Sequence, residues 1–327
     1  KYICNKLLLK SMPKKKVCVI INPVSGTGGK ASIPLKINSA FDPKIYDVII
    51  RYTGYAGHAT EIAKKAVEKK YKYVIAAGGD GTVNEIAKVL VNTPCVLGII
   101  PLGSGNGLAR DLNISMNIDK SIETITKGVK RTIDYGIANE HIFFCTCGVG
   151  FDAFVSERFA DEKMRGPLGY VKNMLESVID FKSEKYELSY EGKTIKERAF
   201  VVTCANASQY GNEAYIAPGA DMEDGKMNVA LIKPITAFEM PQTTIQLFTK
   251  SLHKNNKVIN ILTSDLAIKR NRSGVMHVDG EPIEAGKEIN VKIIPKGLHV
   301  LAPEKEKGEK RPIENDPVLS VFLRWFS

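Results

Sequence analysis

The feature that most constrains this chain is a buried strand that runs directly into a cluster of glycines. The apolar run YVIAA (73–77) stops at GGDG (78–81), and apolar residues at helical spacing follow at once. This succession is typical of an open parallel sheet, whose ligands bind beyond the carboxyl ends of the strands. Glycines there allow the backbone to approach a phosphate closely. We therefore expect an α/β fold with a phosphate-binding edge.

The first 135 residues repeat this alternation of strand and helix. Continuous apolar runs at 17–22, 46–52 and 95–102 predict further strands. Helical patterns follow Lys30, cover 56–70 and begin again near Val83. Strands of this character alternating with helices predict a doubly wound, mostly parallel sheet that is covered on both faces.

The pattern changes after about residue 138. HIFFCTCGVGF (141–151) predicts one strand, and two helical stretches follow, one of them over 170–181. Short β-rich runs with turn signals then predict a mostly antiparallel second domain, with one helix over 236–250 that Pro241 weakens. We therefore expect three parts: an α/β domain (14–138), a β-rich domain (139–303), and a charged linker with an amphipathic tail (304–327).

One carboxylate, Asp80, stands among the glycines of the opening motif. We expect Thr82 to cap the following helix, with Glu85 reaching back in a capping box, so Asp80 is not needed as a cap. A carboxylate beside a phosphate is repulsive unless a metal bridges them or the acid takes a proton in the reaction. This placement predicts nucleotide and Mg²⁺ chemistry; a turn-forming Asp-Gly pair is the alternative.

Two more glycine-rich stretches follow predicted strands. The segment 22–30 departs from a Walker P-loop, because Val24 replaces the first glycine and Ala31 follows Lys30. PLGSGNG (101–107) follows the fourth strand. Three such stretches at three strand ends predict a phosphate cradle, with Lys30 or Arg110 offsetting phosphate charge.

The composition of the chain limits the classes of partner that we expect it to bind. The net charge of +10 favours nucleotide phosphates or acidic lipid headgroups, although solvated helix faces account for much of it. The sequence has no compact basic stripe with interleaved aromatic residues, so we do not expect nucleic-acid binding. No apolar stretch reaches the ~18–20 residues of a membrane span, so we expect a soluble or peripheral protein. Six scattered cysteines without a C-x-x-C pair predict reduced thiols in the cytoplasm.

Five motifs then identify a family resemblance. In chain order they are NPVSG (22–26), GGDGTVNE (78–85), PLGSGNGLAR (101–110), APGADMEDG (217–225) and VDGEP (278–282). Together they resemble the diacylglycerol kinase catalytic-domain family of lipid kinases, with soluble bacterial members nearest and sphingoid-base kinases as relatives. The resemblance covers residues 14–303. GGDGT alone is shared with NAD kinases and phosphofructokinases, and the other motifs distinguish this chain from both.

The resemblance implies an ATP- and Mg²⁺-dependent lipid kinase of phospholipid biosynthesis. The reaction that it favours is the conversion of diacylglycerol to phosphatidic acid. Residues matching the family's nucleotide contacts are Asn22, Pro23, Val24, Ser25, Gly26, Thr53, Gly79, Asp80, Gly81, Thr82, Val83, Asn84, Glu85 and Ser104. Residues matching its second-domain Mg²⁺ site are Asp224, through its side chain, and Asp221 and Lys226, through main-chain carbonyls.

The acceptor's proton has two candidate recipients. Glu281 matches the family's proton acceptor, and Asp80 is the acid of the glycine loops; the sequence does not separate them. Taken alone, the Asp-Gly pairs at 224–225 and 279–280 are also good hairpin turns.

Two departures from the family pattern keep other functions open. Ser104 stands where the family commonly has Thr, and Gly107 stands where bacterial diacylglycerol kinases usually carry Asp. The second change bears on the acid–metal network around Asp80 and resembles sphingoid-base kinases. The alternatives are a sphingoid-base or ceramide kinase, a kinase of soluble substrates like NAD kinase, and a catalytically idle lipid- or nucleotide-binding module.

We expect a lipid substrate at a membrane surface, reached by a cytoplasmic protein that is peripheral at the inner face of the membrane. Either a monomer or a homodimer fits the sequence. Basic charge and four apolar tail residues could dock on that surface, or the tail could pack on its own protein. The four are Val318, Phe322, Trp325 and Phe326.

Overall fold

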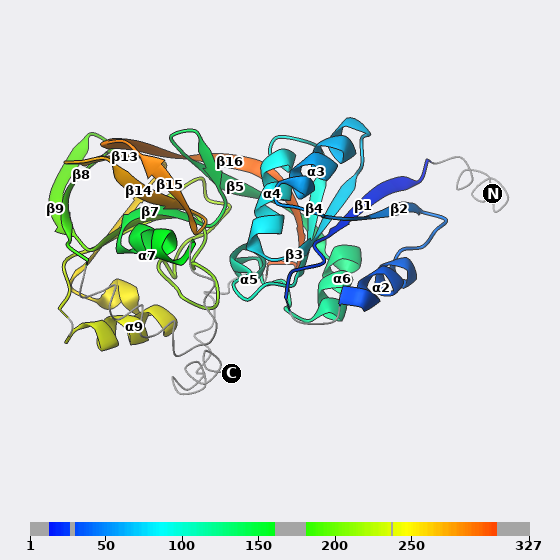
Figure 1. Cartoon of the computed structure of the whole chain (residues 1–327), viewed down its shortest axis with the longest axis horizontal. Helices are drawn as coiled ribbons and strands as arrows, with labels where there is room; N and C mark the ends of the chain where they lie inside the picture. The colour runs from blue at the N-terminus through cyan, green and yellow to red at the C-terminus, as the bar shows by residue number, and fades with distance from the viewer. Residues whose placement is uncertain (1–12, 27–29, 161–180, 237, 306–327) are drawn as a thin grey trace. The chain divides into compact units, whose positions relative to one another are not determined.

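The computed structural model describes residues 13–26, 30–160, 181–236 and 238–305 of the 327. They divide into two compact units (Figure 1). Unit 1 contains the chain up to Arg131 together with Leu298–Glu304, and unit 2 contains Thr132–Gly297 and Lys305. The chain passes between the units in two strands, β5 (Val129–Ala138) and β16 (Glu288–Ala302).

Unit 1 is built on a parallel sheet in the order β2-β1-β3-β4. These strands are β1 (Lys15–Ile21), β2 (Tyr46–Tyr52), β3 (Tyr73–Gly78) and β4 (Val96–Pro101). The last residues of β16 add a further parallel pairing to β4. The strand order reverses between β1 and β3, and the carboxyl ends of strands at such a switch point are where open α/β sheets bind ligands.

Helices cover both faces of this sheet (Figure 1). On one face, Ile33 and Ile37 of α2 and Ile122 of α6 pack in one core cluster with alternate residues of β1. On the other side, α3 packs against α4. The helices of unit 1 are α2 (Ile33–Ala40), α3 (His58–Glu68), α4 (Asp80–Leu90), α5 (Gly107–Asp111) and α6 (Ile118–Lys127), with a 3-10 turn, η1, at Lys30–Ser32. This arrangement confirms the predicted α/β class.

Unit 2 is a pair of packed antiparallel sheets. The first has the order β12-β11-β10-β7-β14-β15, and the second contains β16-β13-β8-β9 with β5 and β6 attached. Residues of both sheets, such as Val202 of β10 and Leu188 of β8, share one core cluster. The mostly antiparallel second part is thereby confirmed.

The bounds of the remaining strands are as follows. The first sheet has β7 (Thr146–Gly150), β10 (Val201–Ala205), β11 (Met227–Ile232), β12 (Val258–Thr263), β14 (Gly274–Val278) and β15 (Glu281–Ala285). The second sheet has β6 (His141–Phe143), β8 (Glu184–Tyr190), β9 (Lys193–Ala199) and β13 (Asp265–Arg270).

Two predicted elements of unit 2 differ in the structure. The single strand expected over 141–151 is wrong, because β6 and β7 are separate strands and Phe151 begins helix α7 (Phe151–Ala160). The helix expected over 236–250 is shorter, α9 (Met240–Phe248), and Pro241 lies in its first turn, where proline is tolerated. A 3-10 turn, η2, follows at Leu252–Lys254.

Other expectations concern segments outside the described residues. These are the predicted helix over 170–181, apart from Phe181, and the tail beyond Lys305. Within the described ranges, no helix is long and apolar enough to cross a membrane. The five cysteines described there are buried free thiols: Cys18, Cys95, Cys145, Cys147 and Cys204.

Candidate active site

Three glycine-rich loops meet at the carboxyl ends of β1, β3 and β4 in unit 1. The Gly79 N–H donates to the Ser25 hydroxyl over 3.4 Å, which joins the first loop to the second. A Cβ on Gly26 would lie 2.2 Å from the carbonyl oxygen of Leu102, and one on Gly103 would lie 2.8 Å from the Cα of Gly79. Glycine is therefore required at these points, because the loop backbones lie too close together for a side chain.

Asp80 ties the third loop to the second. Its Oδ2 accepts the Asn106 N–H and its Oδ1 accepts the Gly107 N–H, each at 2.7 Å. A Cβ on Gly105 would lie 2.7 Å from the same Oδ2, so glycine is needed there as well. The bond at position 107 uses only the backbone amide. Gly107 in place of the aspartate usual in bacterial relatives therefore leaves this anchor intact.

The predicted capping box of α4 is wrong. The helix begins at Asp80 after Gly79, which makes no side-chain cap, so Thr82 lies inside the helix. The Thr82 hydroxyl instead accepts the side-chain N–H of Asn22 at 3.0 Å, and this bond ties the first loop to α4. The Glu85 carboxylate accepts the backbone N–H groups of Gly57 at 3.0 Å and Thr60 at 3.3 Å, at the start of α3. Both side chains hold neighbouring segments around α4.

The two cations expected to offset phosphate charge also contact the loops. The Lys30 ammonium donates to the carbonyls of Pro23 at 2.8 Å and Gly26 at 3.2 Å, which closes the first loop. Arg110 Nε donates to the carbonyl of Gly105 at 2.9 Å. Each cation therefore lies beside a glycine loop and stabilises its backbone.

Most predicted nucleotide contacts lie at this edge of the sheet in unit 1. Thr53 directly follows β2, and its N–H donates to Ile21 at the end of β1. Val24 is 85% exposed at the tip of the first loop. Val83 and Asn84 are buried within α4, where their side chains support the helix and are not open to a ligand.

In unit 2 the VDGEP motif forms a tight hairpin between β14 and β15. Asp279 and Gly280 both have positive φ angles, 50° and 84°, as a two-residue type I′ turn requires. The Asp279 carboxylate also accepts the N–H groups of Phe144 at 2.8 Å, Cys145 at 2.8 Å and Thr146 at 3.0 Å. These bonds break the strand expected over 141–151. They also fix the hairpin whose first β15 residue is the exposed Glu281.

Unit 2 also contains a buried polar cluster that was not predicted from the sequence, centred on Asp152, the second residue of α7. Its Oδ2 accepts the hydroxyls of Thr203 at 2.7 Å and Tyr210 at 3.1 Å and lies 3.0 Å from His277 Nε2. Burial and the Asp152 charge raise the pKa of Tyr210, which keeps its hydroxyl protonated. His277 Nδ1 is buried and has no hydrogen-bond partner among the described residues.

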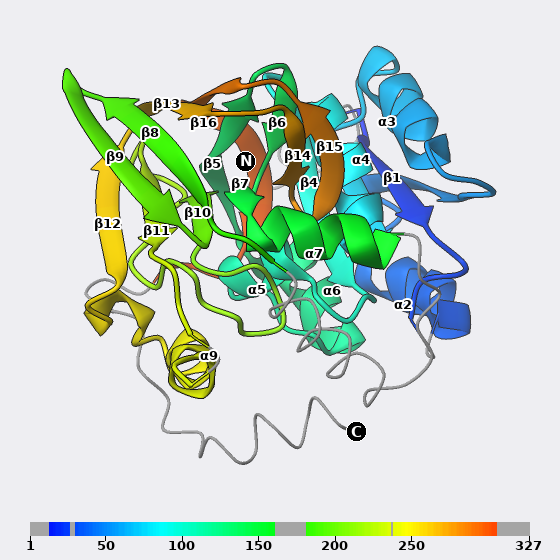
Figure 2. The same ribbon diagram turned by 60° about the vertical axis from the view of Figure 1, so that its left-hand side comes forward.

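This cluster holds α7 against the strand that leads to Glu281, since His277 lies on β14 two residues before Asp279. Figure 2 shows α7 lying across this sheet. A sequence signal for it was the G-x-G-x-D spacing at 148–152, because a Cβ on Gly148 would lie 2.8 Å from Asp152 Oδ2.

The predicted metal residues lie in one turn before β11. Asp224 Oδ1 accepts the Lys226 N–H at 2.9 Å. Asp221 Oδ1 accepts the Glu223 N–H at 3.2 Å, and its Oδ2 lies 2.7 Å from the Lys305 ammonium. Over the described ranges, no group of three or more His, Cys, Asp or Glu side chains is arranged to hold a metal ion. The predicted site, with one carboxylate and two carbonyls, is of another kind and stays a prediction.

A further carboxylate, Asp134, lies beneath this turn. It is fully buried and accepts the N–H groups of Gly225 and Lys296, each at 2.7 Å. Burial raises the pKa of Asp134, although the two N–H donors lower it in part, and the charges of Asp224 and Asp221 raise it further. The turn thus concentrates oxygen donors and negative charge, which suits a hard divalent cation.

Comparisons with known proteins agree with this geometry. Residues 16–138 match the diacylglycerol kinase catalytic domain. Residues 145–302 match the YegS C-terminal NAD kinase beta sandwich-like domain. The diacylglycerol kinase of Bacillus subtilis (strain 168) is 31% identical over 314 residues, which cover 90% of this chain and 99% of the relative. A probable YegS-like lipid kinase of Yersinia pestis (strain Pestoides F) is 29% identical over 263 residues, 78% of this chain and 86% of the relative.

The fold has solved counterparts. A crystal structure of a diacylglycerol kinase from Bacillus anthracis (strain Sterne) superposes with a TM-score of 0.72 at 20% identity, over 89% of this chain and 98% of that chain. A second, putative diacylglycerol kinase from the same strain gives a TM-score of 0.72 at 23% identity over the same shares. The glycine loops, the two-sheet second unit and these matches together show that the chain belongs to the diacylglycerol kinase catalytic-domain family of lipid kinases.

Proposed function

We propose that the chain transfers the γ-phosphoryl group of ATP to the hydroxyl of diacylglycerol and so forms phosphatidic acid at the inner face of the membrane. The observation that carries this proposal is the convergence of three glycine loops around Asp80 at the carboxyl ends of β1, β3 and β4. A relative that is named diacylglycerol kinase and aligns over 99% of its length supports diacylglycerol as the acceptor.

The loops supply a cradle for the triphosphate. A helix of eleven residues, α4, begins among them, and the first N–H groups of a helix are free to bind an anion. A Cβ on Gly81, in the first turn of α4, would meet nothing within 4 Å, so open space lies beside these amides. Backbone amides and open space beside a helix N-terminus are what a phosphate group needs.

We assign the proton transfer to Glu281 and the organisation of the loops to Asp80. Both Asp80 oxygens already accept backbone N–H groups at 2.7 Å, which fixes this carboxylate in place. Glu281 is exposed at the start of β15, on a hairpin that the Asp279 bonds hold rigid. In this reaction the lipid oxygen attacks the γ-phosphorus, the bond to the β-phosphate oxygen breaks, ADP leaves, and Glu281 accepts the hydroxyl proton.

Mg²⁺ fits the oxygen donors of both units. It neutralises charge on the β- and γ-phosphates of a bound nucleotide. Asp80 would hold it in unit 1, because each carboxylate oxygen keeps acceptor capacity beyond its one backbone bond. In unit 2, Asp224 with the carbonyls of Asp221 and Lys226 would hold a structural Mg²⁺ in the turn before β11.

A sphingoid-base kinase is the second candidate, favoured by Gly107 after Asn106. Labelled ATP offered with diacylglycerol, ceramide, a sphingoid base, a polyprenol or NAD decides between the candidates. We expect label in phosphatidic acid. Label only in a phosphorylated sphingoid base would replace the acceptor. Label only in phosphorylated NAD would contradict the lipid assignment, and no transfer to any acceptor would indicate an idle binding module.

A further inference from the structure

The connection between β11 and β12 carries apolar side chains that its own fold leaves in solvent. We call residues 233–257, which contain α9, the α9 insertion. Phe238 is 95% exposed and Ile245 is 41% exposed. Figure 2 shows α9 nearly end-on at the margin of unit 2. Single exposed apolar residues are common on proteins, whereas an exposed set on one face indicates a contact surface.

Exposed residues recur on one side of α9 and in the turn before it. Pro241 and Gln242 lie four and three residues before Ile245 within α9, so these three exposed residues share one side of the helix. Phe238 is exposed in the turn two residues before the helix begins. We call these four residues the outer face.

The opposite side of α9 is already used. Met240 and Leu247 pack against a core cluster of unit 2, and Thr243 is buried. The helix therefore has apolar residues on two sides. Packing within unit 2 explains the inner side and leaves the outer face without a structural role.

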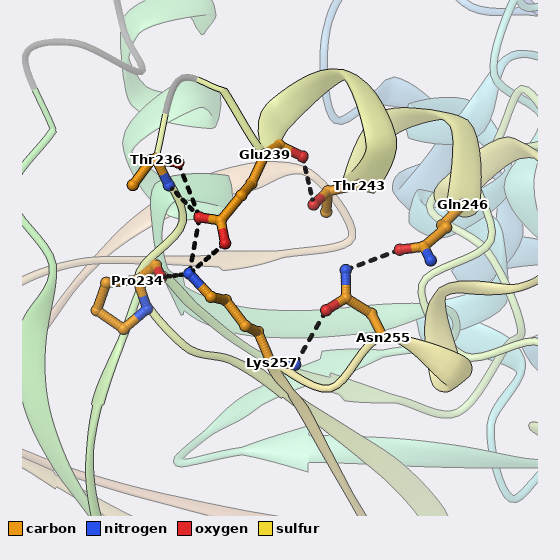
Figure 3. A network of polar contacts seen from close by, with 7 residues as sticks. All are labelled: Pro234, Thr236, Glu239, Thr243, Gln246, Asn255 and Lys257. Carbon is orange, nitrogen blue, oxygen red and sulfur yellow. Dashed lines mark hydrogen bonds and ion pairs between the residues drawn. The ribbon is translucent and has the colours of Figure 1, made fainter.

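A polar network holds the outer face in position (Figure 3). The Glu239 carboxylate accepts the Thr236 N–H at 2.8 Å and hydroxyl at 2.9 Å, and Lys257 binds it at 2.7 Å from the far end of the insertion. Asn255 donates to the Gln246 side chain at 2.7 Å. The ion pair with Lys257, followed by the Thr236 bonds, lowers the pKa of Glu239 to about 2.

The α9 insertion has a net positive charge. It contains four lysines and one acidic residue, Glu239, which pairs with Lys257, while Lys233 pairs with Glu197 of β9. His253 and Lys254 are exposed in η2, the 3-10 turn that follows α9. Exposed apolar side chains on a segment of net positive charge match an anionic bilayer, where apolar groups enter the headgroup boundary and cations face lipid phosphates.

We propose that the outer face of the α9 insertion docks on an anionic lipid bilayer, with Phe238 and Ile245 inserted at the headgroup boundary. This inference rests on the proposed lipid kinase function, because a diacylglycerol acceptor lies in a membrane. It assigns docking to a preorganised helix of unit 2, independently of the tail beyond Lys305.

The test is co-sedimentation of the full chain with vesicles of phosphatidylcholine and phosphatidylglycerol in equal parts, or of phosphatidylcholine alone. The double substitution Phe238→Gln with Ile245→Gln removes the apolar groups. The matched control is Leu262→Gln, at a leucine of β12 that is 48% exposed. We expect the double variant to bind the anionic vesicles at least about tenfold more weakly, since inserting two large apolar groups contributes more than that factor. The control should bind like the wild type, and salt should weaken the wild type.

Activity separates this inference from the proposed function. Turnover on vesicle-borne diacylglycerol should fall with binding, whereas turnover on detergent-dispersed substrate should stay unchanged. If the double variant loses vesicle binding while neither the wild type nor the variant phosphorylates any lipid, the docking surface is supported and the proposed function is contradicted. Wild-type vesicle binding by the double variant would overturn the inference. So would a wild-type dimer that the double variant converts to a monomer, because a second copy of the chain would then cover this face.

Discussion

Replacing Asp80 by asparagine weakens the link between two of the glycine loops. The aspartate accepts one backbone N–H on each oxygen, from Asn106 and from Gly107, at 2.7 Å each. Asparagine has nearly the same shape but only one acceptor oxygen, and its NH₂ group is a donor. One of the two backbone amides would therefore face another donor.

The size of the effect follows from these contacts. A hydrogen bond to a charged group contributes about 1.5–3 kcal/mol, and Asp80 is half-buried, so water replaces the lost bond only in part. We expect Asp80→Asn to lower the free energy of unfolding by about 1–3 kcal/mol. We expect ATP·Mg affinity to fall by about tenfold or more, because the third loop loses one of its two anchoring bonds and the site loses a negative ligand for the metal.

Urea denaturation and calorimetric titration with ATP·Mg measure the two effects separately. The matched control is Asp42→Asn, because Asp42 also accepts a backbone N–H, from Lys44 at 2.8 Å, in the exposed loop between α2 and β2. The control should leave ATP affinity unchanged. If Asp80→Asn keeps wild-type stability and wild-type ATP affinity, Asp80 does not organise these loops and the reasoning fails.

The remaining predictions concern the phosphate cradle, the metal turn and the membrane. Gly81→Ala should weaken ATP binding at least about tenfold without loss of stability, because its methyl group enters the open space where a phosphate is expected. The control Gly286→Ala, whose methyl group also meets open space, should change neither ATP affinity nor stability. If calorimetry gives Gly81→Ala the ATP affinity of the wild type, the proposed phosphate site at the start of α4 is wrong. Asp224→Ala should lower the melting temperature and activity more than Asp221→Ala, since only Asp224 offers its side chain to Mg²⁺, and EDTA should lower the wild-type melting temperature; absence of any EDTA effect would remove this metal site. Vesicle-based turnover should fall as salt is raised, and turnover that ignores both salt and anionic lipid would argue against electrostatic docking.

The architecture of unit 1 could be predicted because its signals are local. A run such as YVIAA followed by glycines specifies a buried strand and a tight loop within ten residues. Parallel strands place such loops at one edge of the sheet, so the convergence of the three loops follows from the topology. The structure confirms the α/β class and brings these loops together at that edge.

The errors have a common physical origin, namely bonds between residues distant in the sequence. Thr82 and Glu85 fit a local capping box, but their partners lie 60 residues away at Asn22 and 28 residues away at Gly57. The strand expected over 141–151 breaks because Asp279, 135 residues from Phe144, binds three amides there. Side-chain partners at such separations leave no periodic trace in the sequence.

The buried cluster around Asp152 was not predicted for the same reason, because 125 residues separate Asp152 from His277. By contrast, the Asp-Gly pair at 279–280 was recognisable as a hairpin turn from its residue types alone. What the sequence could not supply was the second role of Asp279, which is to fix the hairpin on which Glu281 lies.

The central claim is tested most directly by rapid-quench measurement of label transfer from ATP to diacylglycerol by the wild type and by Glu281→Gln. We predict that the wild type forms labelled phosphatidic acid. The variant should form it about 10²–10⁴-fold more slowly at nearly unchanged ATP affinity, because the substitution removes only the charge that accepts the proton. A variant with near-normal transfer would reduce Glu281 to a hairpin residue and leave Asp80 as the candidate base. A wild-type protein that transfers no label to diacylglycerol would contradict the account itself.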